Sequence, residues 1–377
     1  MNTSLVTAVL SNGSSSIQTT VMSFLETIQS LPIPLQVTIL VSILHFTYTV
    51  IVKPIKTNLP LLLEFTFTSV PKIDVPLTEA EANDDGVTSK PYPIDQVNIV
   101  SSTSKSKIQC FDPATLQLIG TLPAMSKSDV NDLCLKAKNA QKSWSQTTYA
   151  QRRLVLRTIQ KYILHHQETI CRVCARDSGK PKVDALLGEV MTTCEKIRCI
   201  NVNGEDWLQP SYRPVGPMMV HKTAFVEYVP YGVLGVIAPW NYPFHNMLNH
   251  VISGLFSGNA VVSKVSEHTA WSSTYFTNIV KKALEVHGHD SDVVQTLTGF
   301  GECGAALVDC EYVDKIIFTG SPKVGRMVMN GCSKNLKPCI LELGGKDPMV
   351  FCDDVNIDVS CTYTYIYYYD KSFSLLS

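Results

Sequence analysis

The run YGVLGVIAPWNYP, residues 231–243, decides the fold of this chain. Its first part is a short apolar stretch that ends at Pro239, which is typical of a buried β-strand. Pro243 then opens an almost entirely apolar segment, residues 243–256, whose length and spacing predict a helix. A strand, a turn and a helix therefore follow one another in close succession.

The same unit recurs further along the chain. Apolar runs that predict strands occupy residues 260–264, 293–297 and 313–319, and helical spacing separates them, most clearly at 271–286. Strands that alternate with helices of about 10 to 15 residues imply right-handed crossovers and a parallel sheet. We expect an α/β fold built on a doubly wound, mostly parallel sheet.

Amphipathic helices are predicted upstream of this sheet. Val130, Ala137 and Trp144 recur at steps that fit one helix face, and Ser126 stands three residues before Asp129 as a possible cap. Further helices are predicted at 154–174 and 182–201. These helices belong with the sheet in one predicted domain, residues 108–345.

Composition limits the classes of function. The chain has 377 residues, of which 45% are hydrophobic and 17% are charged, which is sufficient for two or more packed domains. A formal net charge of −1 lacks the basic excess typical of nucleic-acid-binding proteins, so no nucleic-acid partner is expected. The 12 cysteines are scattered and are expected to be reduced thiols.

Two local patterns contain the residue types of a metal site without its spacing. Cys171 and Cys174 form a CxxC pair, but no second pair lies at zinc-finger spacing, and we interpret both as helix-packing thiols. His165 and His166 are interpreted as a solvated pair between helices or on a polar face. No metal site is expected.

The N-terminal part contains a candidate membrane span. Residues 31–52 contain no Asp, Glu, Lys or Arg and are long enough to cross a bilayer core of about 30 Å. We expect a transmembrane anchor, with a buried helix or a cleaved signal peptide as the alternatives. No Lys or Arg precedes Lys53, so the positive-inside rule leaves residues 1–30 lumenal and the part of the chain after residue 52 cytosolic. Sequons at Asn2 and Asn12 agree weakly with this topology, and we expect the endoplasmic reticulum membrane.

Residues 53–107 are predicted to be a linker. Prolines at positions 54, 60, 71, 76, 91 and 93 and an acidic patch at 79–85 interrupt any long periodicity. A packed domain is therefore not expected in this part of the chain.

Candidate functional residues follow the predicted strands, because ligands of doubly wound sheets bind at the carboxyl ends of the strands. After the first strand, the Asn241 amide can donate a hydrogen bond to an oxyanion, and its alternative role is to cap the next helix. After the second, Lys264 and Glu267 can donate to and accept from ribose hydroxyls.

Two further runs lie near the end of the chain. The run 320–325, GSPKVG, opens a helix with Pro322, and its small residues let a phosphate approach backbone N–H groups; a simple tight turn is the alternative. The run 341–346, LELGGK, places Glu342 beside a Gly-Gly turn. We interpret Glu342 as a buried general base.

Taken in order, these motifs resemble the aldehyde dehydrogenase superfamily over residues 108–358. The resemblance is carried by Pro239-Trp240-Asn241, Lys264-x-Ser-Glu267, Phe318-Thr319-Gly320-Ser321 with Gly325, residues 341–346 and, upstream, Asp177-Ser178-Gly179-Lys180-Pro181. The anchor and residues 189–196 resemble the membrane-attached branch of plants and fungi. The resemblance implies a Rossmann-like NAD-binding domain followed, at 346–358, by the start of a catalytic domain.

The resemblance also implies an activity, the oxidation of an aldehyde to a carboxylic acid with NAD. Asn241 matches the oxyanion donor, and Glu342 matches the general base that activates water. An acidic residue at 267 repels a 2′-phosphate, which favours NAD over NADP. The residues implied to contact the cofactor are Ile237, Pro239, Trp240, Lys264, Ser266, Glu267, Gly320, Ser321 and Gly325.

The chain departs from the family after Asp358. The position that matches the nucleophilic cysteine of the family is Leu376, and residues 359–377 form a tyrosine-rich tail. Cys361 lies too close to Glu342 along the chain to replace that nucleophile. We expect a truncated chain without the nucleophile or the C-terminal arm through which subunits pair. The alternative to an oxidoreductase is a non-catalytic, membrane-tethered NAD-binding fragment.

Overall fold

The computed structural model describes residues 31–47, 64–65, 68–78, 106–345, 350, 352, 354 and 356. The chain divides into two units, Met1–Ser69 and Val70–Ser377. All strands among the described residues belong to the second unit.

In the first unit, residues Ile33–Thr47 form the helix α3, which has 15 residues. Its hydroxyl groups bond back to the preceding turn, Thr38 to the carbonyl of Pro34 and Ser42 to that of Thr38. Within the described part of the chain, no helix combines the length and the apolar character that a bilayer crossing requires. Residues 48–52 of the predicted anchor lie outside the described residues, so the anchor stays a prediction.

The second unit is built on a five-stranded sheet in which every pair of neighbouring strands is parallel. This confirms the predicted α/β architecture, and the predicted strands agree with the observed ones to within two residues. The spatial order is β7-β6-β5-β8-β9. The strands are β5 (Val233–Ile237), β6 (Ala260–Lys264), β7 (Val294–Leu297), β8 (Lys315–Gly320) and β9 (Cys339–Leu343).

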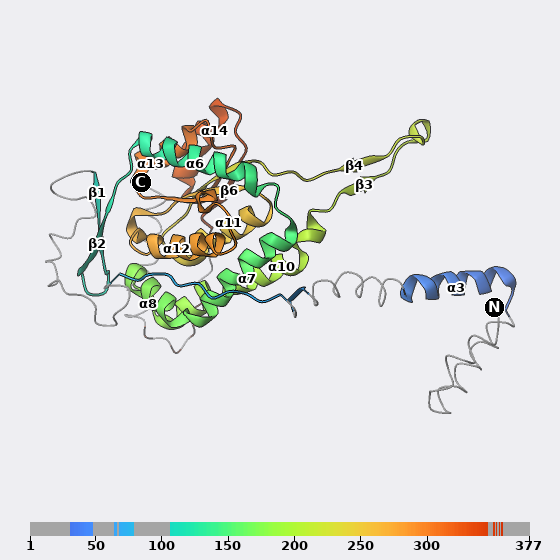
Figure 1. The fold of residues 1–377 in the computed structure, drawn as a ribbon, viewed down its shortest axis with the longest axis horizontal. Helices are drawn as coiled ribbons and strands as arrows, with labels where there is room; N and C mark the ends of the chain where they lie inside the picture. Colours follow the sequence, from blue (N-terminus) through green and yellow to red (C-terminus); the bar gives the residue numbers. More distant parts are fainter. Residues whose placement is uncertain are drawn as a thin grey trace. The chain divides into compact units, whose positions relative to one another are not determined.

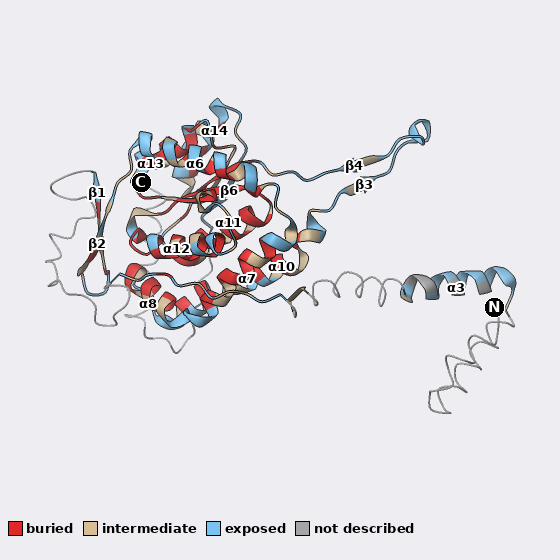
Figure 2. Cartoon of the chain, viewed as in Figure 1, coloured by how far each residue is buried: buried red, intermediate tan, exposed pale blue. Residues whose placement is uncertain are grey.

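Helices cover both faces of this sheet (Figure 1). One face carries α11 (Pro243–Phe256) and α12 (Ser273–Glu285), and the other carries α6 (Lys127–Trp144), α13 (Gly301–Asp309) and α14 (Pro322–Lys334). The buried residues lie on the sheet, on the helix faces turned toward it and where helices pack on one another (Figure 2). Phe244 of α11 and Phe276 of α12 meet edge to face in this core, with ring centroids 4.8 Å apart.

A further helical layer packs on α11 and α12. The helix predicted at 154–174 is in fact two helices, α7 (Tyr149–His165) and α8 (Gln167–Ser178), because His166 leaves the helical conformation with φ −116° and ψ 21°. The helix predicted at 182–201 begins as α9 (Lys182–Asp184), continues through a π-helical turn, η3 (Ala185–Met191), and ends as α10 (Thr192–Trp207). No pattern in residues 182–201 indicated the π-helical turn.

The described residues of the second unit also contain two antiparallel hairpins and three short 3₁₀ turns. The hairpins are β1 (Lys107–Phe111) with β2 (Leu118–Pro123) and β3 (Ser211–Arg213) with β4 (Ala224–Val226), and the turns are η4 (Pro217–Met219), η5 (Glu267–Thr269) and η6 (Ser291–Val293). Within the predicted linker, Val75 is buried in the core and the carbonyl of Val70 accepts a hydrogen bond from Lys161. This part of the linker is therefore packed on the domain.

Candidate active site

The register of the sheet brings the predicted cofactor residues to one edge. Ile237, at the carboxyl end of β5, lies opposite Lys264 on β6 and opposite Phe318 on β8. Gly320, at the end of β8, lies opposite Leu343 on β9. The segments that contain the predicted cofactor residues therefore all leave the sheet at the same edge, which is where ligands of such sheets bind.

Lys264 and Glu267 form an ion pair at this edge. The Lys264 Nζ lies 2.8 Å from Glu267 Oε2, and the two side chains are 8% and 28% exposed. Burial raises the pKa of Glu267, but the charge and the hydrogen bond of Lys264 outweigh that effect and hold the pKa below its ordinary value. Ser266 shapes the turn by accepting a hydrogen bond from the backbone N–H of His268. The pair thus offers an ionised acceptor beside a cationic donor.

The turn after β8 opens α14 in the predicted way. Ser321 is the N-cap, its hydroxyl accepts from the backbone N–H of Val324, and Pro322 occupies the first turn. A Cβ atom on Gly325 would lie 2.6 Å from Leu343 Cδ2. Gly325 therefore permits the close packing of α14 on β9, and its predicted place in a phosphate-facing turn stays a prediction.

The loop after β5 contains Pro239, Trp240 and Asn241. Trp240 is 52% exposed, and Asn241 is exposed as well. Asn241 does not cap α11, because Tyr242 is the N-cap and makes no side-chain capping bond, so the alternative role given to Asn241 is wrong. Its Oδ1 instead accepts a hydrogen bond from Asn246 Nδ2 at 3.0 Å. This bond engages the acceptor oxygen of the Asn241 amide, and the donor group is Nδ2.

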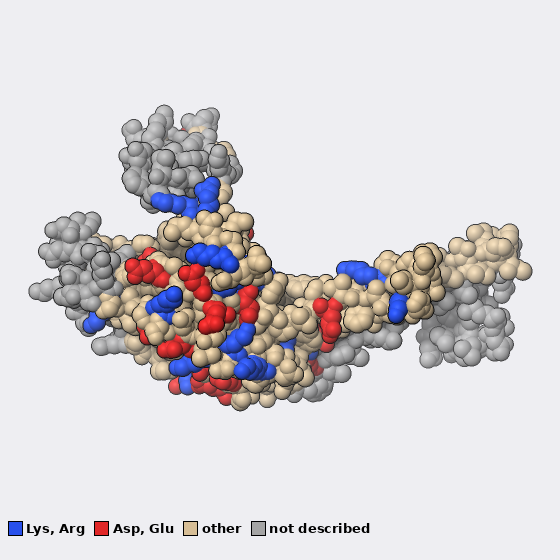
Figure 3. Space-filling view, turned by 90° about the horizontal axis from the view of Figure 1, so that it is seen from above, with Lys and Arg blue, Asp and Glu red and all other residues tan. Residues whose placement is uncertain are grey.

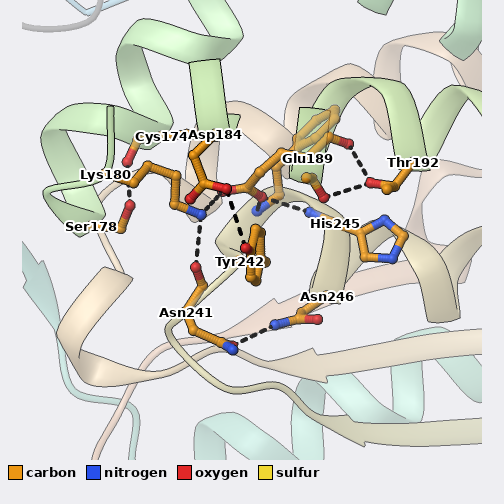
Figure 4. Close-up of polar contacts among 12 residues, drawn as sticks. Cys174, Ser178, Lys180, Asp184, Glu189, Thr192, Asn241, Tyr242, His245 and Asn246 are labelled. Atoms are coloured by element: carbon orange, nitrogen blue, oxygen red, sulfur yellow. Dashed lines mark hydrogen bonds and ion pairs between the residues drawn. The ribbon is translucent and has the colours of Figure 1, made fainter. Parts of the chain in front are cut away.

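A buried ion pair beside this loop was not among the predicted site residues. Lys180 Nζ lies 2.6 Å from Glu189 Oε1, with the two side chains 7% and 0% exposed. Figure 4 shows Lys180 and Glu189 converging on the segment that contains Asn241 and Tyr242. The sequence signal was available, since Glu189 is a charged residue in an otherwise apolar helical turn and Lys180 follows a helix-ending glycine.

Tyr242 lies under the same pair. Its ring centroid is 3.9 Å from Lys180 Nζ, and its hydroxyl donates to Asp184 Oδ1 at 3.3 Å. Burial, followed by the charge of Asp184, raises the pKa of the Tyr242 hydroxyl. The phenol therefore remains a neutral donor at physiological pH.

Glu342 is exposed, which corrects the prediction of a buried general base. It lies on β9 opposite Thr319, and β9 is the outermost strand of the five in the described sheet. The flanking leucines suggested burial, but Leu341 is only half-buried and Leu343 is exposed because an edge strand is covered less than a central one. Glu342 is the last residue but one of β9, just before Gly344 and Gly345, and its role as a general base stays a prediction.

A cavity of about 510 Å³ lies away from these residues. Its lining includes Arg152, Glu205, Pro230 and Ser257, and Pro230 and Ser257 precede the amino ends of β5 and β6. The Arg152 guanidinium donates to the carbonyls of Ser145 and Phe256. This cavity is therefore on the opposite edge of the sheet from the candidate site.

The fold and this edge define a class of protein, the Rossmann-like α/β domains with a ligand site at the strand carboxyl ends. Residues 99–366 match the model of the aldehyde dehydrogenase family, and the chain belongs to that family. The match extends beyond residues 108–358, the range expected from the motifs, at both ends.

Proteins of two yeasts illustrate the relationship. A protein of Saccharomyces cerevisiae named as aldehyde dehydrogenase-like is 37% identical over 324 residues, which are 83% of this chain and 49% of that protein. A similarly named protein of Schizosaccharomyces pombe is 37% identical over 253 residues, 67% of this chain and 48% of that protein. The chain thus spans about half the length of the curated relatives it matches.

Solved structures show the same relationship. A glyceraldehyde-3-phosphate dehydrogenase of Methanocaldococcus jannaschii, complexed with NADP, has a TM-score of 0.59 and 27% identity, covering 64% of this chain and 51% of that one. The protein PnpE, in complex with nicotinamide adenine dinucleotide, has a TM-score of 0.60 and 27% identity, covering 74% and 56%. Either nicotinamide cofactor is therefore found among the structural neighbours.

Proposed function

We propose that this chain binds NAD at the carboxyl edge of its sheet and belongs to a protein that oxidises an aldehyde to a carboxylic acid. The observation that carries the proposal is the Lys264–Glu267 ion pair at the end of β6, where both side chains are held in place. The residues present fit a dinucleotide, since the ion pair can contact ribose hydroxyls. The N-terminus of α14, where Ser321 is the N-cap, lies at the same edge, and helix N-termini attract phosphate groups.

The charge of Glu267 supports NAD over NADP. An ionised carboxylate accepts hydrogen bonds from a ribose diol, but it repels a 2′-phosphate. The depressed pKa of Glu267 keeps it ionised throughout the physiological range.

The proposed chemistry assigns two roles to residues of this chain. NAD, when bound, accepts a hydride from the substrate. The Asn241 amide donates to the oxygen on which negative charge develops, and Glu342 accepts a proton from the water that releases the acid. The predicted lack of a nucleophilic thiol stays a prediction, because residues 357–377 lie outside the described residues.

A titration of this chain with NAD and with NADP, followed by calorimetry, tests the proposal. We expect tighter binding of NAD, and the variant Glu267→Gln reduces the ratio of the two affinities about tenfold, which corresponds to about 1.4 kcal/mol. The matched control is Glu285→Gln, which breaks a Lys–Glu pair of the same i,i+3 spacing on α12 and leaves the ratio unchanged. Equal affinities for NAD and NADP in the unaltered chain contradict the assignment.

A second candidate function is a non-catalytic NAD-binding chain. The exposure of Glu342 favours it, because a general base in open solvent lacks the protected environment in which such residues work best. Incubation with NAD and a long-chain aldehyde separates the two candidates. Production of NADH supports the oxidoreductase, whereas binding of NAD without turnover supports the second candidate.

The membrane attachment and location are part of the proposal. We propose that residues 31–52 anchor the chain in the endoplasmic reticulum membrane with the α/β domain in the cytosol. The support is the absence of charged residues in this stretch and the exposed apolar side chains of Ile33, Val37 and Val41 on α3. A hydrophobic aldehyde substrate would agree with this location.

A further inference from the structure

We propose that Lys180 and Glu189 are positioning residues that hold the Asn241 amide in the orientation an oxyanion requires. The inference rests on the role proposed above for Asn241. It adds two residues that do not touch the substrate and that act through the backbone of the loop at residues 239–243.

Glu189 fixes the start of α11. Its Oε2 accepts hydrogen bonds from the backbone N–H groups of Phe244 and His245, at 2.8 and 3.0 Å. The first N–H groups of a helix have no partner within the helix, and the positive end of the helix dipole attracts a carboxylate. Because Tyr242, the N-cap residue, makes no side-chain capping bond, Glu189 supplies the cap from another element.

Lys180 fixes the loop that precedes this helix. Its Nζ donates to the carbonyl oxygen of Asn241 at 2.7 Å and to Glu189 Oε1 at 2.6 Å, and it lies over the Tyr242 ring (Figure 4). The pair therefore hydrogen-bonds to the backbone at Asn241 and again at residues 244 and 245. The loop between these points has little freedom to rotate.

The side chain of Asn241 is linked to Glu189 through the first turn of α11. Asn246, in the first turn of α11, donates to Asn241 Oδ1, so the orientation of the amide depends on where α11 begins. Glu189 sets that beginning. A shift of the loop by about 1 Å would misplace the donor, and misplacements of that size reduce turnover by about 10²-fold.

The backbone that contains the pair itself, residues 179–191, has unusual local conformations. Glu189 lies within the π-helical turn Ala185–Met191, and π-helical turns occur frequently at functional sites. A Cβ atom on Gly188 would lie 2.4 Å from the Tyr242 ring, so only glycine lets the ring lie against this turn. Gly179, with φ 76°, ends α8 in the left-handed conformation just before Lys180. The π-helical turn, Gly188 and Gly179 thus all lie next to the Lys180–Glu189 pair or to the Tyr242 ring beside it.

The competing explanation is that the pair has a structural role alone. Buried ion pairs often add little net stability, which argues against that explanation. The two explanations differ in what they predict for the Asn241 side chain. A positioning role predicts that breaking the pair changes the Asn241 amide and turnover and leaves NAD affinity unchanged. A structural role predicts a lower melting temperature only.

The test measures the side-chain amide of Asn241 in this chain by NMR, with the signal assigned from its loss in Asn241→Asp. We expect Lys180→Met and Glu189→Gln to move this signal toward that of a free side chain, while the NAD affinity stays within about twofold. Where the protein turns over an aldehyde, kcat falls about 10²-fold with an unchanged KM for NAD. The matched control is the exposed pair Lys182–Glu168, 53% and 71% exposed, whose variants Lys182→Met and Glu168→Gln change nothing.

An unchanged Asn241 signal in folded Lys180→Met and Glu189→Gln, with a lower melting temperature, overturns the proposal. If neither variant folds, Asn246→Ala decides, because it removes the bond to Asn241 Oδ1 without altering the buried pair. The same shift of the Asn241 signal supports the proposal, and no shift contradicts it. Failure of NAD to bind the unaltered chain would instead contradict the proposed function. The NMR experiment would still show whether Lys180 and Glu189 orient the Asn241 amide, because it does not require NAD.

Discussion

At the residue scale, Asp177 is a carboxyl group buried inside the domain. Its pKa is raised to about 7, mainly because burial disfavours the charged form; the backbone N–H and side chain of Ser272 lower the pKa, and the charges of Glu189 and Asp112 raise it. The folded state therefore binds a proton that the unfolded state has released above about pH 4. The contribution of Asp177 to the free energy of unfolding therefore falls between about pH 4 and pH 7 and levels off above that range.

The variant Asp177→Asn isolates this effect. We expect the free energy of unfolding of the unaltered chain, relative to the variant, to decrease by about 1.4 kcal/mol per pH unit between pH 4 and pH 7. Urea denaturation at a series of pH values measures the difference. A difference that is constant over this range would mean that Asp177 titrates normally.

At the element scale, the packing of α11 on β6 depends on one glycine. A Cβ atom on Gly254 would lie 2.5 Å from Val261 Cγ2, and Val261 is a fully buried, β-branched residue that cannot move aside. Gly254→Ala should destabilise the domain by about 1 to 3 kcal/mol through overpacking. Gly304→Ala, in α13, is the control, since its nearest neighbour is the Ile237 Cδ1 atom at 4.0 Å.

Thermal unfolding of the two variants distinguishes packing from helix propensity. Both glycines lie inside helices, where alanine is intrinsically favoured by up to about 1 kcal/mol. We expect a lower melting temperature for Gly254→Ala and an equal or higher one for Gly304→Ala. A rise in both would show that the α11–β6 contact has room for a methyl group.

The strands β5 to β8 and the helices between them were predictable from the sequence, but the short hairpins and the contacts between distant elements were not. The strands could be located because Pro239 and neighbouring turn residues interrupt short apolar runs, and the predicted helix at 243–256 coincides with α11. The Lys180 contact joins residues 61 positions apart, and no local pattern encodes it. The prediction that Glu342 is buried was wrong because exposure depends on the place of β9 in the sheet, which no local pattern encodes either.

At the scale of the whole molecule, charge distribution and membrane attachment matter most. Acidic and basic side chains are interspersed on the face seen in Figure 3, in keeping with a net charge of −1.

The proposed anchor predicts that the chain sediments with membranes and resists alkaline extraction. Val41→Lys should shift it to the soluble fraction, because a lysine in the bilayer centre costs about 2.5 to 3.5 kcal/mol.

The control for this experiment is Val183→Lys. Val183 is also an exposed valine, but it lies on α9 in the second unit, outside residues 31–52. The fraction that sediments should not change in this variant. Release of the unaltered chain by alkali would contradict the anchor.

The order of the strands has a consequence for how a ligand is contacted. The chain adds β6 and β7 on one side of β5 and then returns to add β8 and β9 on the other, so the direction of winding reverses at β5. The connections that leave β5 and β8 consequently turn to opposite faces, toward α11 and α14 (Figure 1). A molecule at this reversal is approached by one helix N-terminus from each layer, and that arrangement comes from the path of the backbone rather than from any side chain. Changes of side chain can therefore alter which ligand is accepted while the place where it binds stays the same.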